Sequence, residues 1–272
     1  MPIRTTRKQT AAAFTLTEFV VVCGVLVLLA ATLLPALGAA RENSLMAQSM
    51  SNLRQLVVAN QNYAADHGRY CPADDRWNNR RWHGARTSAS APFDPTKGYL
   101  SDYLGKSRRV SICPLFREMV ADGHSFEVST GGYGYNASYI GGTPSAAYDA
   151  QGRRISAPLA RLQRSDTVMF TTSAYATGDS VQEYPYCEPP FWDFGSGPTE
   201  WRPSPTVHFR FRGSALVAWC DGRVTAEAIA PRENGANMHG GDAAAQELGW
   251  FGPDTENGFW NPARRAALVS KR

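Results

Sequence analysis

The chain has 272 residues, of which 43% are hydrophobic and 19% are charged, and this balance excludes global disorder. The formal charge is +4, and Arg4, Arg7 and Lys8 supply three of the positive charges within the first 13 residues, which hold no acidic residue. Residues 14–272 therefore carry 25 basic and 24 acidic side chains, a near balance that argues against a nucleic-acid-binding protein.

A long apolar segment follows this basic N-terminus. Residues 14–34 form a run of 21 residues, and residues 19–34 include no charged side chain. As a helix the run would extend roughly 30 Å, which is the thickness of a bilayer core. Because the basic residues precede it, the positive-inside rule predicts a cytoplasmic N-terminus and an exported remainder.

Three interpretations of the apolar segment are open. It suits a secretory signal peptide cut near Ala40, and it equally suits a simple signal anchor. Neither explains Glu18, because a carboxylate inside a membrane segment costs about 3 kcal/mol and needs a partner. The third interpretation supplies that partner, namely the new α-amino group of a neighbouring chain that has been cut before Phe14.

Residues 14–18, FTLTE, resemble the cleavage motif of type IV pilins and type II secretion pseudopilins. The resemblance implies that a prepilin peptidase cuts between Ala13 and Phe14 and methylates the new N-terminus. It also implies that Glu18 pairs with the Phe14 amine of another subunit, and that Pro35 stands where the family has a helix proline. Ala13 replaces the usual glycine before the cut, which predicts slower processing, and Thr17 replaces the commoner isoleucine.

Beyond Pro35, apolar residues recur every three or four positions, which predicts an amphipathic helix over residues 36–66. Pro35 is expected to kink the helix near Ala31. The whole helix would cover residues 14–66, with 14–34 in lipid or a filament core. Its second part would pack against a globular head formed by residues 67–272.

Several short motifs resemble a large group of pseudopilin-like proteins from planctomycete, verrucomicrobial and lentisphaeral bacteria. The N-terminal ones are LPAL at 34–37, NLRQ at 52–55, YAAD at 63–66 and GRY at 68–70. That group also has a Cys-Pro pair and a Tyr-Gly-Tyr-Asn motif, which this chain has at 113–114 and 133–136. Its final feature is a histidine before an Asp-Gly turn, and here Phe211 stands in the place of that histidine, with His208 nearby.

The head is expected to be α+β, with the long helix packed on a loop-rich antiparallel β-sheet. Strands are predicted at 110–113 and 167–176. The run GGYGYNASYIGG at 131–142 alternates aromatic and small residues and is expected to be a strand with bulges, with an aromatic ligand-binding surface as the alternative. The clearest signal is a hairpin of 214–220 and 223–229, in which Asp221 and Gly222 supply the positive φ angles of a tight turn. A short helix is predicted at 98–105, and long loops are predicted at 71–98 and 178–206, the second of which either packs compactly or meets a partner.

Four cysteines in the exported head suggest one or two disulfides, with free buried thiols as the alternative. They are Cys71, Cys113, Cys187 and Cys220. Four cysteines allow three connectivities, and the sequence does not choose among them. Cys23 lies in the apolar segment and is expected to act as a small apolar residue.

Oxygen-bearing residues near the C-terminus suggest a calcium site, with a solvated turn as the alternative. They are Asp242, Asp254, Glu256 and Asn257. The resemblance supports the suggestion, because major pseudopilins bind calcium in a loop of their C-terminal region. The local sequence DTENG is not an EF-hand loop.

The sequence holds no metalloprotease, P-loop, dinucleotide-binding or hydrolase motif, so no enzymatic activity is expected. The resemblance implies a structural subunit of a pseudopilus or pilus-like filament, anchored in the inner membrane with its head in the periplasm or on an extracellular filament. The implied partners are other pilin or pseudopilin subunits and the prepilin peptidase. The alternatives are a signal-anchored or secreted protein that binds a glycan or other surface ligand, and a secreted enzyme.

Overall fold

A computed structural model describes residues 15–120, 127–161, 166–231, 238 and 240–263. The chain divides into two compact units, Met1–Ser44 and Leu45–Arg272. This division falls inside the first helix, whereas the sequence suggested a head that begins after the helix, at residue 67. The expected α+β class is confirmed, because one long N-terminal helix precedes several small antiparallel sheets.

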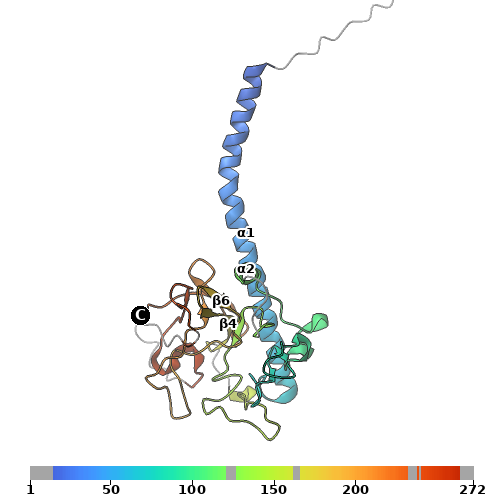
Figure 1. The fold of residues 1–272 in the computed structure, drawn as a ribbon, viewed down its shortest axis with the longest axis vertical. Helices are drawn as coiled ribbons and strands as arrows, with labels where there is room; N and C mark the ends of the chain where they lie inside the picture. The colour runs from blue at the N-terminus through green and yellow to red at the C-terminus, as the bar shows by residue number, and fades with distance from the viewer. Residues whose placement is uncertain (1–14, 121–126, 162–165, 232–237, 239, 264–272) are drawn as a thin grey trace, which may run out of the picture. The chain divides into compact units, whose positions relative to one another are not determined.

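Helix α1, Leu16–His67, is the long helix that the hydropathy and the amphipathic pattern predicted, and it continues through Pro35 (Figure 1). In the first unit its large apolar side chains are exposed, from 48% at Val22 to 81% at Leu16. An 18-residue window of α1 has a mean hydropathy of 2.7 and no buried residue. This segment is therefore a candidate membrane span or signal sequence, and no second helix in the described ranges is as long and as apolar.

The last turns of α1 belong to the head and have the predicted amphipathic character. Leu53, Leu56 and Val57 are buried, whereas Arg54 and Gln55 are exposed. The buried side chains pack in one cluster with aromatic and aliphatic residues of the central sheet. Burial of this face, rather than helix propensity alone, therefore stabilises the end of α1.

The central sheet of the head is four-stranded and antiparallel, in the order β3-β4-β8-β9. Its strands are β3 Tyr133–Tyr135, β4 Val168–Thr172, β8 Ser214–Trp219 and β9 Val224–Ala228. In β8, Leu216 and Ala218 pack in the cluster that contains the α1 side chains. Val217 and Trp219 pack in a second cluster on the opposite face. Strand β8 is apolar at almost every position because both of its faces are covered.

The remaining elements of the described chain are short. Two-residue and three-residue strands pair as antiparallel ladders: β1 Arg80–Arg81 with β2 Gly84–Ala85, β5 Tyr175–Thr177 with β6 Ser180–Gln182, and β7 Val207–His208 with β10 Leu248–Gly249. The short helices are α2 Pro114–Met119 and the 3₁₀ helices η1 Pro95–Lys97, η2 Ser101–Tyr103, η3 Gly105–Ser107, η4 Leu159–Arg161 and η5 Thr255–Trp260. Long connecting loops therefore form much of the head, as its glycine and proline content predicted.

The strand predicted at 110–113 does not form. Cys113 instead precedes helix α2, and its N–H donates to the carbonyl of Gly131 at 2.9 Å. Pro114 is the first residue of α2, a position where its missing N–H removes no helical hydrogen bond. The Cys-Pro pair therefore starts a helix, and the apolar residues before it do not find a partner strand.

The predicted hairpin of β8 and β9 is confirmed, with Ala218 opposite Val224, but its turn differs from the expectation. Gly222 has a φ of 90°, whereas Asp221 is not among the described residues with positive φ. The N–H of Gly222 donates to the carbonyl of Trp219 at 3.0 Å, and Asp221 Oδ1 accepts the N–H of Arg223 at 3.1 Å. The turn is longer than two residues, so a single glycine supplies the unusual φ angle and the aspartate stabilises the turn.

Candidate functional site

Glu18 closes the N-terminal end of α1 by a reciprocal pair of hydrogen bonds with Thr15. The Thr15 N–H donates to Glu18 Oε2 at 2.9 Å, and the Glu18 N–H donates to Thr15 Oγ1 at 3.2 Å. The Thr15 hydroxyl also donates to Glu18 Oε2 at 2.7 Å. This arrangement is a capping box, in which a threonine and a glutamate three residues later satisfy helix N–H groups that have no partner in the helix.

This cap was not predicted, although its signal, Thr-x-x-Glu before an apolar run, is present at 15–18. The cap gives Glu18 a local role that does not require a second chain. Ala13 and Phe14, the two residues at the expected cut, lie outside the described residues. Pro35 lies within α1, in the first unit.

In the head, a closed ring of hydrogen bonds joins α1 to the central sheet. Asn60 Nδ2 donates to the Tyr135 hydroxyl at 2.9 Å, and that hydroxyl donates to the Cys71 carbonyl at 3.0 Å. The Cys71 N–H completes the ring by donating to Asn60 Oδ1 at 2.9 Å. All three residues are fully buried. This helix–sheet latch of Asn60, Cys71 and Tyr135 fixes the position of the helix end relative to β3.

Two of the resemblance motifs meet beside the latch. Asn52 of NLRQ donates through Nδ2 to the hydroxyl of Tyr133 at 3.1 Å. The residue between the two tyrosines is Gly134. A side chain is not tolerated there, because a Cβ would lie 2.5 Å from the carbonyl oxygen of Tyr186. The aromatic residues of β3 are buried in the core. The Tyr-Gly-Tyr motif therefore holds the helix, and its rings do not form a ligand-binding surface.

We expect Asn60→Ala to lower the free energy of unfolding of the head by about 3 kcal/mol, because the Cys71 N–H and the Tyr135 hydroxyl lose buried partners. Asn62→Ala is the matched control, since Asn62 is exposed on the same helix, and its effect should stay below about 0.5 kcal/mol. Urea unfolding of the full-length chain in detergent, followed by tryptophan fluorescence, measures both. Equal midpoints for the two variants would contradict the role of the latch.

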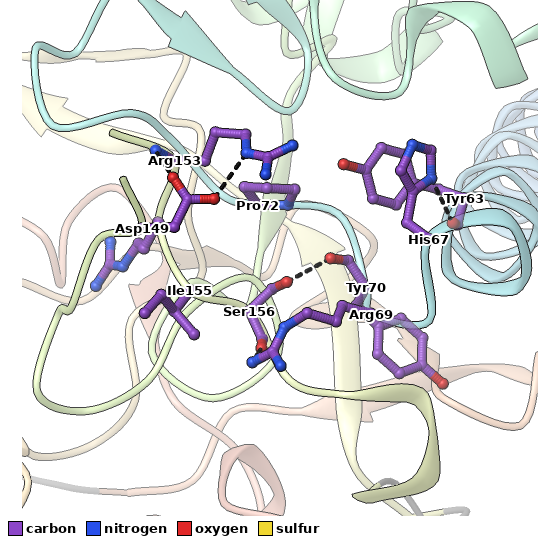
Figure 2. Close-up of a pocket in the computed structure, with 10 residues that line it drawn as sticks. Tyr63, His67, Arg69, Tyr70, Pro72, Asp149, Arg153, Ile155 and Ser156 are labelled. Atoms are coloured by element: carbon purple, nitrogen blue, oxygen red, sulfur yellow. Dashed lines mark hydrogen bonds and ion pairs between the residues drawn. The ribbon is translucent and has the colours of Figure 1, made fainter. Parts of the chain in front are cut away.

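A cavity of about 330 Å³ lies beside the C-terminal end of α1 (Figure 2). His67 Nδ1 is 2.9 Å from the Tyr63 carbonyl oxygen, and the two rings stack with centroids 4.1 Å apart. Asp149 Oδ2 accepts Arg153 Nε at 2.8 Å on another wall, as Figure 2 shows. In the described part of the chain no hydroxyl or thiol is hydrogen-bonded to His67. The Ser156 hydroxyl, which also lines the cavity, donates instead to the Tyr70 carbonyl.

The disulfides expected from the sequence do not form, and the alternative of free buried thiols holds. Cys71, Cys113, Cys187 and Cys220 are all free and buried. Cys113 Sγ lies 3.2 Å from Ser49 Oγ, and Cys71 Sγ donates to the Pro72 carbonyl at 3.2 Å. Burial raises the pKa of the Cys71, Cys187 and Cys220 thiols, which keeps them protonated. These cysteines are packed separately as small apolar residues, so an even count in the head did not indicate pairing.

The expected calcium site is also corrected, because the structure gives its residues separate roles. Asp242 Oδ1 accepts the N–H groups of Ala244 and Ala245 at 2.9 and 3.1 Å. Asp254 Oδ2 lies 3.2 Å from Arg202 Nη2. The described residues contain no group of three or more acidic, histidine or cysteine side chains that could hold a metal ion. Within the described ranges Asp242, Asp254 and Glu256 therefore do not gather into one acidic site.

Asn257 is the amide residue of the expected calcium set. It is buried in the head, and both polar atoms of its side chain are hydrogen-bonded. Its Oδ1 accepts the Phe191 N–H at 2.8 Å, and its Nδ2 donates to the Tyr139 hydroxyl at 2.8 Å. Glu256 beside it has a φ of 53° in the irregular η5 segment. The DTENG sequence therefore forms a structural turn that ties the C-terminal segment to the loop around Phe191.

Comparisons of the chain with protein-family models, with curated proteins and with solved structures find no match.

Proposed function

We propose that the chain is a structural, non-catalytic subunit of a type II secretion pseudopilus or a type IV pilus-like filament, matured by a prepilin peptidase. The observation that carries the proposal is Glu18, a carboxylate in the first turn of a helix whose following turns are apolar and exposed. The capping box stabilises the helix start by about 1 kcal/mol, whereas insertion of the charge costs about 3 kcal/mol, so a cap alone does not account for an acid at this position in a simple anchor or a signal peptide.

The exposed apolar surface of α1 supports an assembly role. Phe19, Leu26 and Leu29 are each more than half exposed. Removing each of these side chains from water is favourable by about 2 kcal/mol. Lipid covers these side chains while the subunit is in the membrane. In a filament the same side chains would be buried against the equivalent helices of neighbouring subunits, which replaces the lipid.

Glu18 would set the axial position of each subunit in that bundle. After cleavage before Phe14, the new α-amino group carries a positive charge that can pair with Glu18 of a neighbour. Inside an apolar bundle an unpaired carboxylate is strongly unfavourable, so a subunit inserted at the wrong height would be penalised. The capping box gives Glu18 a fixed position on the first turn of the helix, from which it can meet the neighbouring amine.

The charge distribution supports the orientation that this role requires. Arg4, Arg7 and Lys8 precede the apolar segment, a pattern that favours a cytoplasmic N-terminus and a periplasmic head, with the subunit anchored in the inner membrane before assembly. The proposed partners are other pilin or pseudopilin subunits and the prepilin peptidase.

The test is mass spectrometry of the N-terminal peptide from host membranes. We expect a peptide that begins with N-methyl-Phe14. A peptide that begins near Arg41 would overturn the proposal in favour of a secreted head. An N-terminus at Met1 or Pro2 would overturn it in favour of a simple anchor, provided that an Ala13→Gly variant, which restores the usual glycine before the cut, also stays uncut.

A further inference from the structure

The loop of residues 191–202 exposes large aromatic side chains on the surface of the head. Phe194 is 68% exposed and Trp201 is 76% exposed. Together with Trp192, Thr199 and Glu200 they line a groove of about 460 Å³. Exposed aromatic residues that gather in one groove are unfavourable in water, so a binding role is the usual reason for them.

Hydrogen bonds hold this loop in a defined conformation. The Trp192 N–H donates to the Trp201 carbonyl at 2.9 Å, and the Thr199 N–H donates to the Trp192 carbonyl at 2.7 Å. These bonds place Trp192 and Trp201 opposite each other on the two arms of the loop. The groove therefore exists before any ligand binds, which reduces the entropic cost of binding.

Asp193 fixes the tip of the loop and attaches it to the head. Its Oδ1 accepts the N–H groups of Gly195 and Gly197 at 2.9 and 3.2 Å. Its Oδ2 accepts the hydroxyl of Tyr139 at 2.8 Å, and Tyr139 in turn accepts a hydrogen bond from the buried Asn257. The turn that carries the aromatic side chains is therefore held in place by the hydrogen bonds of Asp193.

The electrostatics of the groove exclude an anionic ligand. Glu200 supplies the one charge of the lining, and among the described residues its carboxylate has no hydrogen-bond or ion-pair partner. Arg202, the nearest cation in sequence, is engaged elsewhere, because its guanidinium lies 4.2 Å from the Phe191 ring centre and 3.2 Å from Asp254 Oδ2. The ligand is therefore neutral or cationic.

The size and shape of the groove select among such ligands. A lining of five residues is small beside the 20 to 30 residues that each side of a typical protein–protein interface contributes, whereas about 460 Å³ suits a small ligand. The Trp192 and Phe194 rings are nearly parallel, at 15° with centroids 6.3 Å apart. Because these two rings stack on each other, the outer face of the pair is the flat platform, whereas a cage for an organic cation needs rings that face it from several directions.

We propose that this groove binds a neutral carbohydrate chain. The C–H groups on one face of a pyranose ring carry slight positive charge and match the negative face of an aromatic ring. The sugar hydroxyls at the edge of the platform would donate to the Glu200 carboxylate. The groove binds sugar through residues that have no part in the filament role, so this inference is independent of the proposed function.

The test is affinity electrophoresis of the full-length chain in detergent, in gels that contain hydroxyethyl cellulose, xylan or galactomannan. We expect at least one of these neutral polysaccharides to retard the chain. A double Phe194→Ala, Trp201→Ala variant should bind about tenfold more weakly, because two stacking contacts are lost. Trp77→Ala is the matched control, since Trp77 is 61% exposed and does not line the groove, and it should change binding less than about twofold.

Three results would overturn the proposal: no retardation by any of the polysaccharides, retardation that the double variant retains in full, or loss of retardation in the Trp77→Ala control. A second experiment tests whether the groove binds an organic cation instead of a sugar. Quenching of tryptophan fluorescence by tetramethylammonium, abolished in Glu200→Gln and accompanied by no polysaccharide binding, would assign the groove to an organic cation and reject the sugar. An unchanged melting temperature of the double variant shows that its loss of binding does not reflect unfolding.

Discussion

Glu18→Gln is expected to reduce filament assembly at least about tenfold while leaving membrane insertion and the helix start intact. Glutamine can still accept the Thr15 N–H, so the capping box survives, whereas the negative charge that would pair with a neighbouring amine is lost. The measurement is the amount of sheared filament, determined by immunoblot in the native host. Membrane fractionation reports insertion in the same cells.

Thr15→Ala provides the matched control, because it keeps the charge and removes the hydroxyl that accepts the Glu18 N–H at 3.2 Å. It should destabilise the helix start by about 1 kcal/mol and leave assembly close to normal. Glu18→Leu removes both the cap and the charge and should behave like Glu18→Gln in assembly. If Thr15→Ala impairs assembly and Glu18→Gln does not, Glu18 acts as a helix cap and the proposed pairing is wrong.

Acidification is expected to destabilise the head by up to about 5 kcal/mol between pH 6.5 and pH 4.5. Two histidines are buried and neutral. Burial lowers the pKa of His83 well below its usual value of 6.5, and nearby Arg81 and Arg86 lower it further. Burial, with the charge of Arg210, lowers the pKa of His208 to about 2. Neither ring can gain a proton in this pH range without losing its buried position.

The sign of the effect follows from proton binding. Below pH 6.5 the unfolded chain protonates both histidines and the folded chain does not, so the unfolded state is favoured by about 1.4 kcal/mol per pH unit for each ring. Burial raises the pKa of the Glu183 and Glu188 carboxyls, which act in the opposite direction at the acidic end of the range. The measured slope should therefore be somewhat smaller than the full value for two histidines.

Urea unfolding of the full-length chain in detergent at several pH values measures this slope. His208→Gln should flatten it by about 1.4 kcal/mol per pH unit, and His83→Asn serves the same purpose if the first variant folds poorly. His67→Gln is the control, because His67 is exposed at the end of α1. A wild-type slope near zero, or equal slopes in all of these variants, would contradict the prediction.

Local patterns in the sequence determined the long helix, its division into an exposed apolar part and an amphipathic part, and the β8–β9 hairpin. Each of these depends on side chains that repeat over a few neighbouring residues, so a short window contains the whole signal. The capping box of Thr15 and Glu18 was equally local and could have been predicted from its spacing. The strand expected at 110–113 failed because a strand needs a partner, and the sequence around it does not specify one.

Only the tertiary structure decided the contacts between distant residues. Asn60 and Tyr135 are 75 positions apart, and their hydrogen bond depends on how the helix packs on the sheet. The same holds for Cys71, which packs as a buried thiol instead of pairing, and for Asn257, whose amide binds the Tyr139 hydroxyl 118 positions away. Packing is decided by the fit of many side chains at once, and no short stretch of sequence contains that information.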